Sequence, residues 1–90
     1  MPTVRILQPL RKLAGDLESI DVAAPTVAGV IEHLDEQYPG FRARLFDGQD
    51  QLKQFINIYL DGEDIRFLDG LNTAVPERAE VMIVPAVAGG

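Results

Sequence analysis

Two short stretches near the start of the chain alternate hydrophobic and polar residues. In residues 3–7, Val4 and Ile6 fall on one side and the other three residues on the opposite side, a period of two that predicts a strand. Residues 17–22 repeat this alternation. Residues 8–16 contain a proline and a glycine and are predicted to form a long turn. The opening third of the chain is therefore predicted to be a hairpin.

Apolar residues then recur at intervals of three, four and seven, which predicts one amphipathic helix. They are Val27, Val30, Ile31, Leu34 and Tyr38. Thr26 stands just before this stripe as the expected N-cap, and the Pro-Gly pair after it ends the helix. Residues 41–46 are predicted to form a short second helix or a turn, with Phe41 and Leu45 directed inward.

The second half of the chain carries three further strand signals. Residues 55–60 are rich in β-branched and aromatic side chains, and the Asp-Gly pair that follows favours a tight turn. Residues 65–68 are predicted to return as a short strand. Residues 81–84 are continuously apolar, which is typical of a strand in the centre of a sheet. Pro85 lacks a backbone donor and is expected to end that strand.

The predicted order of elements is strand, strand, helix, strand, short strand and strand. This order predicts an α+β fold in which a mixed sheet packs against one main helix, and it is the order of the β-grasp (ubiquitin-like) fold. A chain of 90 residues has room for one hydrophobic core. We therefore expect residues 1–85 to form a single β-grasp domain and residues 86–90 to form a flexible C-terminal tail that ends in Gly-Gly.

One helix covers only one face of the predicted sheet. If the isoleucines of residues 55–60 face the helix, then Phe55, Asn57 and Tyr59 face outward, beside alternate residues of the strand at 81–84. Such an apolar patch is a candidate partner-binding face, formed by Phe55, Tyr59, Phe67 and Met82. There are two alternatives. Residues 55–60 have the opposite register, or residues 41–52 cover this face.

Composition and charge narrow the classes of function. The net charge of −6 and the isoelectric point near 4.5 argue against a nucleic-acid partner, which needs clustered Lys and Arg. The chain has no cysteine, which favours a reducing compartment, and we expect a cytoplasmic protein. The N-terminal residues do not resemble a signal peptide, and no stretch approaches the length of a membrane-spanning helix, so no membrane association is expected.

The side chains offer little catalytic chemistry. The chain has one serine, Ser19, one histidine, His33, and no cysteine, so a nucleophilic triad is not expected. The carboxylates of residues 61–64 lack the spacing of a calcium loop and are predicted to belong to a charged hairpin turn. We therefore predict no catalytic residue, no metal site and no enzyme activity.

The reactive group is then sought in the backbone. Gly89 and Gly90 are no wider than the main chain, and glycine tolerates the unusual dihedral angles of a bent approach. The five residues that follow Pro85 span roughly 17 Å when extended. Such a tail can reach from a docked domain into a narrow active site, which makes the carboxylate of Gly90 the candidate reactive group.

The chain resembles the ThiS/MoaD group of ubiquitin-like sulfur carrier proteins, and within it the CysO-type members associated with cysteine biosynthesis. The resemblance covers nearly the whole chain. It is carried by FINIYLDGEDIRF at residues 55–67, DGLNTAV at residues 69–75 and, above all, VMIVPAVAGG at residues 81–90.

The resemblance implies that Gly90 is adenylated and converted to a thiocarboxylate that donates sulfur in biosynthesis. Gly89, Ala88 and Val87 would be the residues that thread into the activating enzyme. The implied partners are a ubiquitin-activating-like adenylyltransferase or sulfurtransferase, a cysteine synthase-like acceptor and a metalloprotease. The carrier itself would bind no cofactor, since the activating partner uses the ATP. The alternatives are a carrier for molybdopterin or thiamine thiazole synthesis, and a protein modifier conjugated through Gly90.

Overall fold

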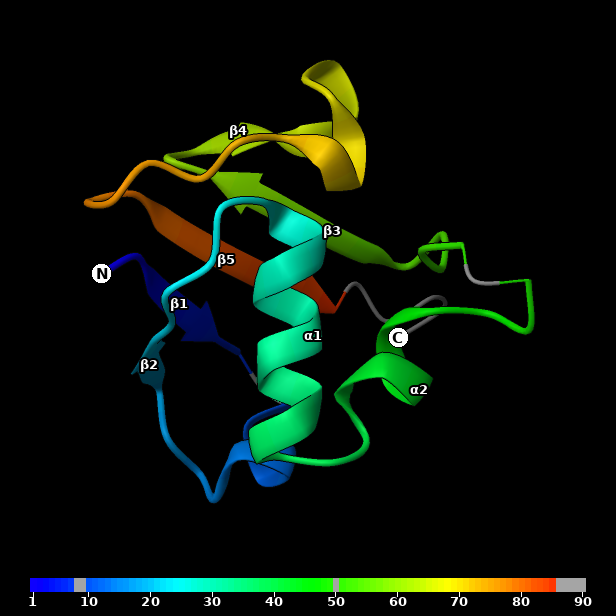
Figure 1. The fold of residues 1–90 in the computed structure, drawn as a ribbon. Helices are drawn as coiled ribbons and strands as arrows, with labels where there is room; N and C mark the ends of the chain where they lie inside the picture. The colour runs from blue at the N-terminus through cyan, green and yellow to red at the C-terminus, as the bar shows by residue number, and fades with distance from the viewer. Residues whose placement is uncertain (8–9, 50, 86–90) are drawn as a thin grey trace.

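A computed structural model describes residues 1–7, 10–49 and 51–85 of the chain. Five strands and two α-helices account for most of the regular structure (Figure 1). The strands are β1 (Thr3–Ile6), β2 (Ser19–Asp21), β3 (Ile56–Leu60), β4 (Glu63–Asp64) and β5 (Glu80–Pro85). The helices are α1 (Val27–Gln37) and α2 (Phe41–Leu45), with three short 3-10 helices, η1 (Leu10–Ala14), η2 (Ile65–Phe67) and η3 (Gly70–Asn72).

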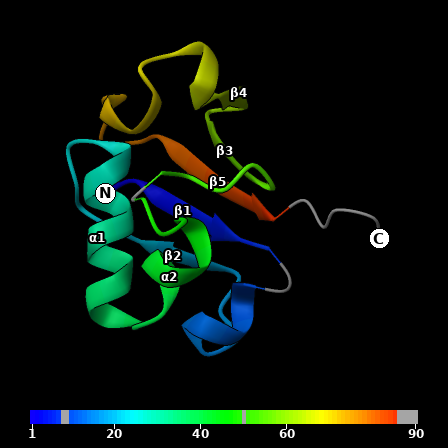
Figure 2. The same cartoon turned by 90° about the vertical axis from the view of Figure 1, so that its right-hand side faces the viewer.

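The strands form one mixed sheet in the order β2-β1-β5-β3-β4. The first and last strands, β1 and β5, run parallel side by side, while the other neighbours are antiparallel. Figure 2 shows β5 between β1 and β3. The predicted central position of β5 and the predicted hairpin of β1 and β2 are therefore confirmed.

One face of this sheet carries the hydrophobic core. Val81 is the register partner of both Val4 and Leu60, and Ile83 is the partner of both Ile6 and Ile58, so these apolar residues line up across three strands. α1 lies across that face (Figure 1). The fully buried side chains of the core include Val4, Ile6, Val22, Val27, Val30, Ile31, Leu34, Phe41, Leu45, Ile58, Ile65 and Ile83.

The main helix begins where the sequence predicts. The Thr26 hydroxyl accepts a hydrogen bond of 3.2 Å from the backbone N–H of Gly29, which satisfies one of the unpaired donors of the first turn. The helix ends at Gln37, and the N–H of Tyr38 donates to the carbonyl oxygen of Leu34 at 2.7 Å. Pro39 follows, and the helix cannot continue through it because the proline ring is incompatible with a helix interior.

The second helix lies on the same side of the sheet as the first. Phe41 and Leu45 are fully buried in the common core, as predicted. The Asp35 carboxylate joins the two helices, since its Oδ1 accepts from the N–H groups of Gly40 and Arg42 at 3.1 Å each. α2 therefore extends the covered face, and the alternative in which this segment covers the opposite face is wrong.

The hairpin after β3 is confirmed, but the strand predicted at residues 65–68 is wrong. Asp61 and Gly62 form the turn with φ angles of 49° and 88°, the left-handed pair that a tight hairpin requires. The returning strand is only β4, and the chain then coils into η2. The cause is local, because the Asp64 carboxylate accepts from the N–H of Arg66 at 2.8 Å and caps a helical turn.

The predicted long turn at residues 8–16 contains the 3-10 helix η1. Leu10 and Ala14 of η1 are buried in the core. The Arg11 guanidinium fixes this turn, since its Nε donates to the carbonyl oxygen of Ile6 at 2.9 Å. The turn therefore adds apolar cover at the end of β1.

Candidate functional site

The face of the sheet opposite the helices is centred on two of the predicted residues. Tyr59 of β3 and Met82 of β5 are directly paired across the antiparallel ladder, and both side chains are half-buried. Arg5 flanks Met82 on β1, and Asp64 flanks Tyr59 on β4. Paired side chains in such a row lie within contact distance. The structure thus brings Tyr59 and Met82 together, in the register that turns the isoleucines of β3 inward.

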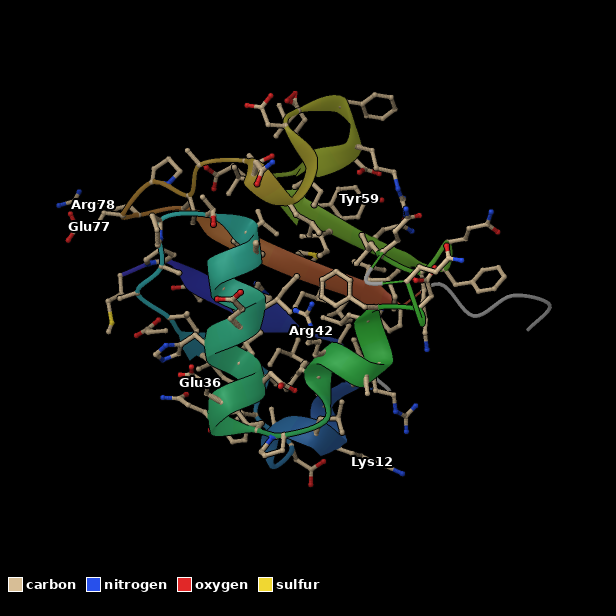
Figure 3. The ribbon with its side chains drawn as sticks, turned by 45° about the vertical axis from the view of Figure 1, so that its right-hand side comes forward. Lys12, Glu36, Arg42, Tyr59, Glu77 and Arg78 are labelled. Atoms are coloured by element: carbon tan, nitrogen blue, oxygen red, sulfur yellow. The ribbon has the colours of Figure 1, made fainter. Side chains whose placement is uncertain are left out.

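The other two predicted face residues lie at the margins of β3. Phe55 directly precedes the strand and is 52% exposed, while Phe67 lies in η2 and is 83% exposed. Figure 3 places Tyr59 on the strand between these two segments. An exposed aromatic ring on a folded turn gains apolar contacts only when a partner covers it. The predicted face is therefore a half-buried centre with two exposed aromatic margins.

The turn that carries Phe67 is fixed by its neighbour Arg66. The guanidinium of Arg66 donates to the side-chain oxygen of Asn57 and, at 2.8 Å, to the backbone carbonyl oxygen of Ile56. Its Nη1 also lies 3.7 Å from the carboxylate of Asp64. Buried Ile65 anchors the same turn in the core. Phe67 is thus presented from a backbone that is held on two sides.

Three residues of this site were not among the four predicted for the apolar patch, although Asn57 was expected to face outward. Asn57 and Val84 are partners in the β3–β5 ladder and share the face of Tyr59 and Met82. Residues two apart along a strand lie on the same face, so the positions of Asn57 and Val84 relative to Tyr59 and Met82 could have identified both. Arg66 had no such signal, because the sequence placed it in a strand rather than in η2.

Two of the carboxylates after β3, those of Asp61 and Asp64, have structural partners. Oδ1 of Asp61 accepts from the N–H of Glu80 at 2.9 Å, and Oδ1 of Asp64 caps η2. Within residues 1–7, 10–49 and 51–85, no three or more His, Cys, Asp or Glu side chains gather as a metal site requires. The same residues form no pocket. None of the helices among them has the length and apolar character needed to cross a membrane.

The predicted reactive residue, Gly90, and the predicted threading residues, Gly89, Ala88 and Val87, lie outside the described residues. The domain boundary after Pro85 also stays a prediction. The structure does locate the residue from which this segment continues. Pro85 ends β5 and is the register partner of Ile56 at the start of β3.

Comparison with known proteins assigns the class. The model of the ThiS family matches residues 4–90, and the chain therefore belongs to the ThiS family, whose members are ubiquitin-like sulfur carriers. Among curated proteins, the chain is 41% identical over 90 residues to the sulfur carrier protein CysO of Mycobacterium tuberculosis, covering 98% of this chain and 97% of the relative.

Solved structures confirm the fold. A chain in the crystal structure of the BexX/CysO complex from Amycolatopsis orientalis superposes with a TM-score of 0.92 and 37% identity over 100% of both chains. The solution structure of the small archaeal modifier protein 1 from Methanosarcina acetivorans matches with a TM-score of 0.86 and 30% identity, over 99% of this chain and 95% of that one. The predicted ubiquitin-like β-grasp fold and the CysO-type resemblance are both confirmed.

Proposed function

We propose that this chain is a sulfur carrier whose Gly90 carboxylate is converted to a thiocarboxylate that supplies sulfur for cysteine biosynthesis. The observation that carries the proposal is the near full-length identity of 41% to a sulfur carrier protein CysO. The match to the ThiS family also extends through Gly89 and Gly90. The chain then acts as a substrate of other enzymes and not as a catalyst.

The proposed activation has two steps. A carboxylate oxygen of Gly90 attacks the α-phosphorus of ATP on the activating enzyme, pyrophosphate leaves, and an acyl adenylate forms. Sulfide sulfur then attacks the carbonyl carbon, AMP leaves, and the carboxylate oxygen has been replaced by sulfur. Compared with the free carboxylate, the acyl adenylate carries a good leaving group, and the thiocarboxylate carries a nucleophilic sulfur. ATP is used by the activating partner, and this chain needs no bound cofactor.

The family resemblance implies three partners for this chemistry. A ubiquitin-activating-like adenylyltransferase or sulfurtransferase installs the sulfur, and a cysteine synthase-like enzyme accepts it. The thiocarboxylate sulfur displaces a leaving group from the acceptor carbon, so the product stays joined to Gly90 through a thioester until water cleaves that acyl linkage, which restores the Gly90 carboxylate and frees the thiol. A metalloprotease is the proposed third partner for this release.

The exposed margins of the open face support docking of such enzymes. Phe67 and Phe55 present apolar surface, and Tyr59 with Met82 forms the half-buried centre between them. Rigid aromatic residues are the usual anchors of protein interfaces. A CysO protein of Amycolatopsis orientalis was solved in a complex with BexX, so a similar chain does form a protein complex.

A second function is favoured by a separate observation. The chain is also 34% identical, over 72% of its length, to the small archaeal modifier protein 3 of Haloferax volcanii. An acyl adenylate of Gly90 can be attacked by a lysine amine in place of sulfide, which leaves an isopeptide bond to another protein. We keep protein modification through Gly90 as the alternative.

Intact-mass spectrometry tests the proposal directly. The purified chain is incubated with its cognate activating enzyme, ATP and sulfide, and a variant that lacks Gly90 serves as the control. Replacement of one oxygen by sulfur adds about 16 Da, and only the chain with Gly90 should gain it. Covalent adducts on lysines of other proteins would favour the modifier function instead. An unchanged mass with an enzyme that activates a known carrier would overturn both.

A further inference from the structure

Positive charge is concentrated at one end of this acidic molecule. Residues 41–57 carry three cations, Arg42, Arg44 and Lys53, against two carboxylates, whereas the rest of the chain carries five cations against twelve carboxylates. The segment is thus net +1 and the remainder net −7, in a chain of net charge −6. Such asymmetry orients a protein in the field of a charged partner.

Backbone hydrogen bonds place this segment beside the end of β5. The backbone N–H of Lys53 donates to the carbonyl oxygen of Leu45 at 2.9 Å, which ties Lys53 to the last residue of α2. The N–H of Ile56 donates in turn to the carbonyl oxygen of Lys53 at 3.1 Å, and Ile56 is the register partner of Pro85. Figure 1 shows α2, the start of β3 and the end of β5 at the same end of the molecule.

Arg66 adds a fourth cation to this end through its hydrogen bond to the Ile56 carbonyl oxygen. We call Arg42, Arg44, Lys53 and Arg66 the cationic end. Arg78 provides the contrast, because it lies just before β5 begins, at the opposite end of that strand (Figure 3).

Two members of the cationic end are available to an incoming carboxylate. Arg44 is exposed, Lys53 is half-buried, and neither takes part in the ion pairs formed within the described part of the chain. The carboxylate nearest to Arg44 in the sequence, Asp47, is occupied by its own loop, since its Oδ1 accepts from the N–H groups of Gln49 and Gln51 at 2.8 and 3.1 Å.

We propose that the cationic end is the surface by which this chain docks on an acidic rim around the active site of its activating enzyme. The inference rests on the proposed function and names the surface and the charge that its first partner recognises. Only the five residues 86–90 separate Pro85 from the reacting carboxylate, a span of roughly 17 Å. An enzyme that holds Gly90 beside ATP must therefore come close to the end of β5, where the cations lie.

Charge complementarity supports an acidic rim. An acidic surface repels a chain of net charge −6 least in the orientation that leads with its positive end. The cationic end thereby selects the orientation that points residues 86–90 toward the enzyme. Rim charges of this kind act mainly on the association rate and on its dependence on salt.

Charge reversal tests the docking surface. Arg44→Glu and Lys53→Glu are compared with Arg78→Glu, because each replacement exchanges one positive for one negative charge and moves the net charge from −6 to −8. Thermal unfolding first establishes that each variant is folded. Where a reversal to Glu does not fold, the same residue is replaced by Gln instead, as in Lys53→Gln. The initial rate of thiocarboxylate formation is then measured by intact-mass spectrometry at a series of carrier concentrations, at roughly 50 and 300 mM salt.

The expected result is a kcat/KM lower by about tenfold for Arg44→Glu and Lys53→Glu at low salt, through a raised KM with little change in kcat. Added salt should slow the parent chain and reduce this gap, and Arg78→Glu should behave as the parent does. Equal kcat/KM values for all three variants would overturn the inference while leaving sulfur carriage intact. Normal thiocarboxylation with slow sulfur transfer to the acceptor would assign the surface to the acceptor enzyme instead, and also overturns it. A parent chain that gains no sulfur contradicts the proposed function itself.

Discussion

Arg66 and Ile56 are joined by a hydrogen bond of 2.8 Å, from the guanidinium of the first to the backbone carbonyl oxygen of the second. β4 pairs with β3 only at Tyr59 and Leu60, so the edge of β3 at Ile56 lies beyond the strand. The Arg66 side chain supplies there the donor that a longer β4 would have provided. The Arg66 side chain thus takes the place of one strand-to-strand hydrogen bond, and it holds η2 against the sheet.

Replacement of Arg66 should therefore destabilise the domain. We expect Arg66→Ala to lower the free energy of unfolding by about 1–2 kcal/mol, because two hydrogen bonds from a charged donor are lost and the part-buried carbonyl oxygen of Ile56 loses its Arg66 donor. Arg66→Lys should recover only part of this, since an ammonium lacks the planar fork that reaches both oxygens. Urea unfolding measures both, with Arg78→Ala as the control. Equal stability of Arg66→Ala and that control would contradict this role.

Phe67 should matter for binding and not for stability. Its ring is 83% exposed, so Phe67→Ala should change the free energy of unfolding by less than about 0.5 kcal/mol. Fully buried Phe41 provides the matched contrast, and Phe41→Ala should cost about 3–5 kcal/mol.

The functional readout for Phe67 is the KM of the activating enzyme for the carrier. Loss of an exposed aromatic anchor should raise that KM severalfold, because anchors of this type carry a large share of interface energy. If Phe67→Ala leaves thiocarboxylation and sulfur transfer both unchanged, the ring is not part of a docking face.

The cap of α1 permits a separate test of the fold. Thr26→Ala removes the acceptor of the Gly29 N–H and should lower the free energy of unfolding by about 1 kcal/mol. Thr26→Ser retains an acceptor at the same place and should stay close to the parent. Chemical unfolding of the three chains in parallel gives the comparison, and an Ala variant as stable as the Ser variant would rule out the cap.

Deletion of Gly90 should separate the fold from the function. Among the described residues the core ends at Ile83, so the shortened chain should melt at the same temperature as the parent. It should form no thiocarboxylate under conditions that convert the parent. A clear fall in melting temperature would mean that Gly90 packs against the domain, contrary to the proposed use of a free terminal carboxylate.

Elements with a strong local pattern could be predicted from the sequence. The stripe from Val27 to Leu34 and the cap at Thr26 fixed α1, and the uninterrupted apolar run of β5 indicated its central place. Residues 65–68 were misassigned because Ile65 and Phe67 fit a period of two, while the capping carboxylate of Asp64 favours a helical turn. Propensity over residues 65–68 could not decide between the two, since the deciding cap comes from Asp64, which precedes them.

The open face was predictable in its centre and not at its margins. Alternation alone pairs the outward residues of β3 and β5, and it identifies Tyr59 and Met82. The separation of Phe55 from Phe67 depends on how the chain turns after β4, and the cationic end depends on α2 meeting the start of β3. Both are contacts between distant parts of the sequence, which no single-segment pattern contains.

The central position of β5 has a consequence for how the protein is made. β1 and β2 reach β3 only through β5, so a chain still on the ribosome cannot close its sheet until its final strand has been released. Folding of this domain must then follow translation of β5. A product truncated before β5 would lack both its sheet and its reactive end, and its exposed, unpaired strands would mark it for degradation by cellular proteases.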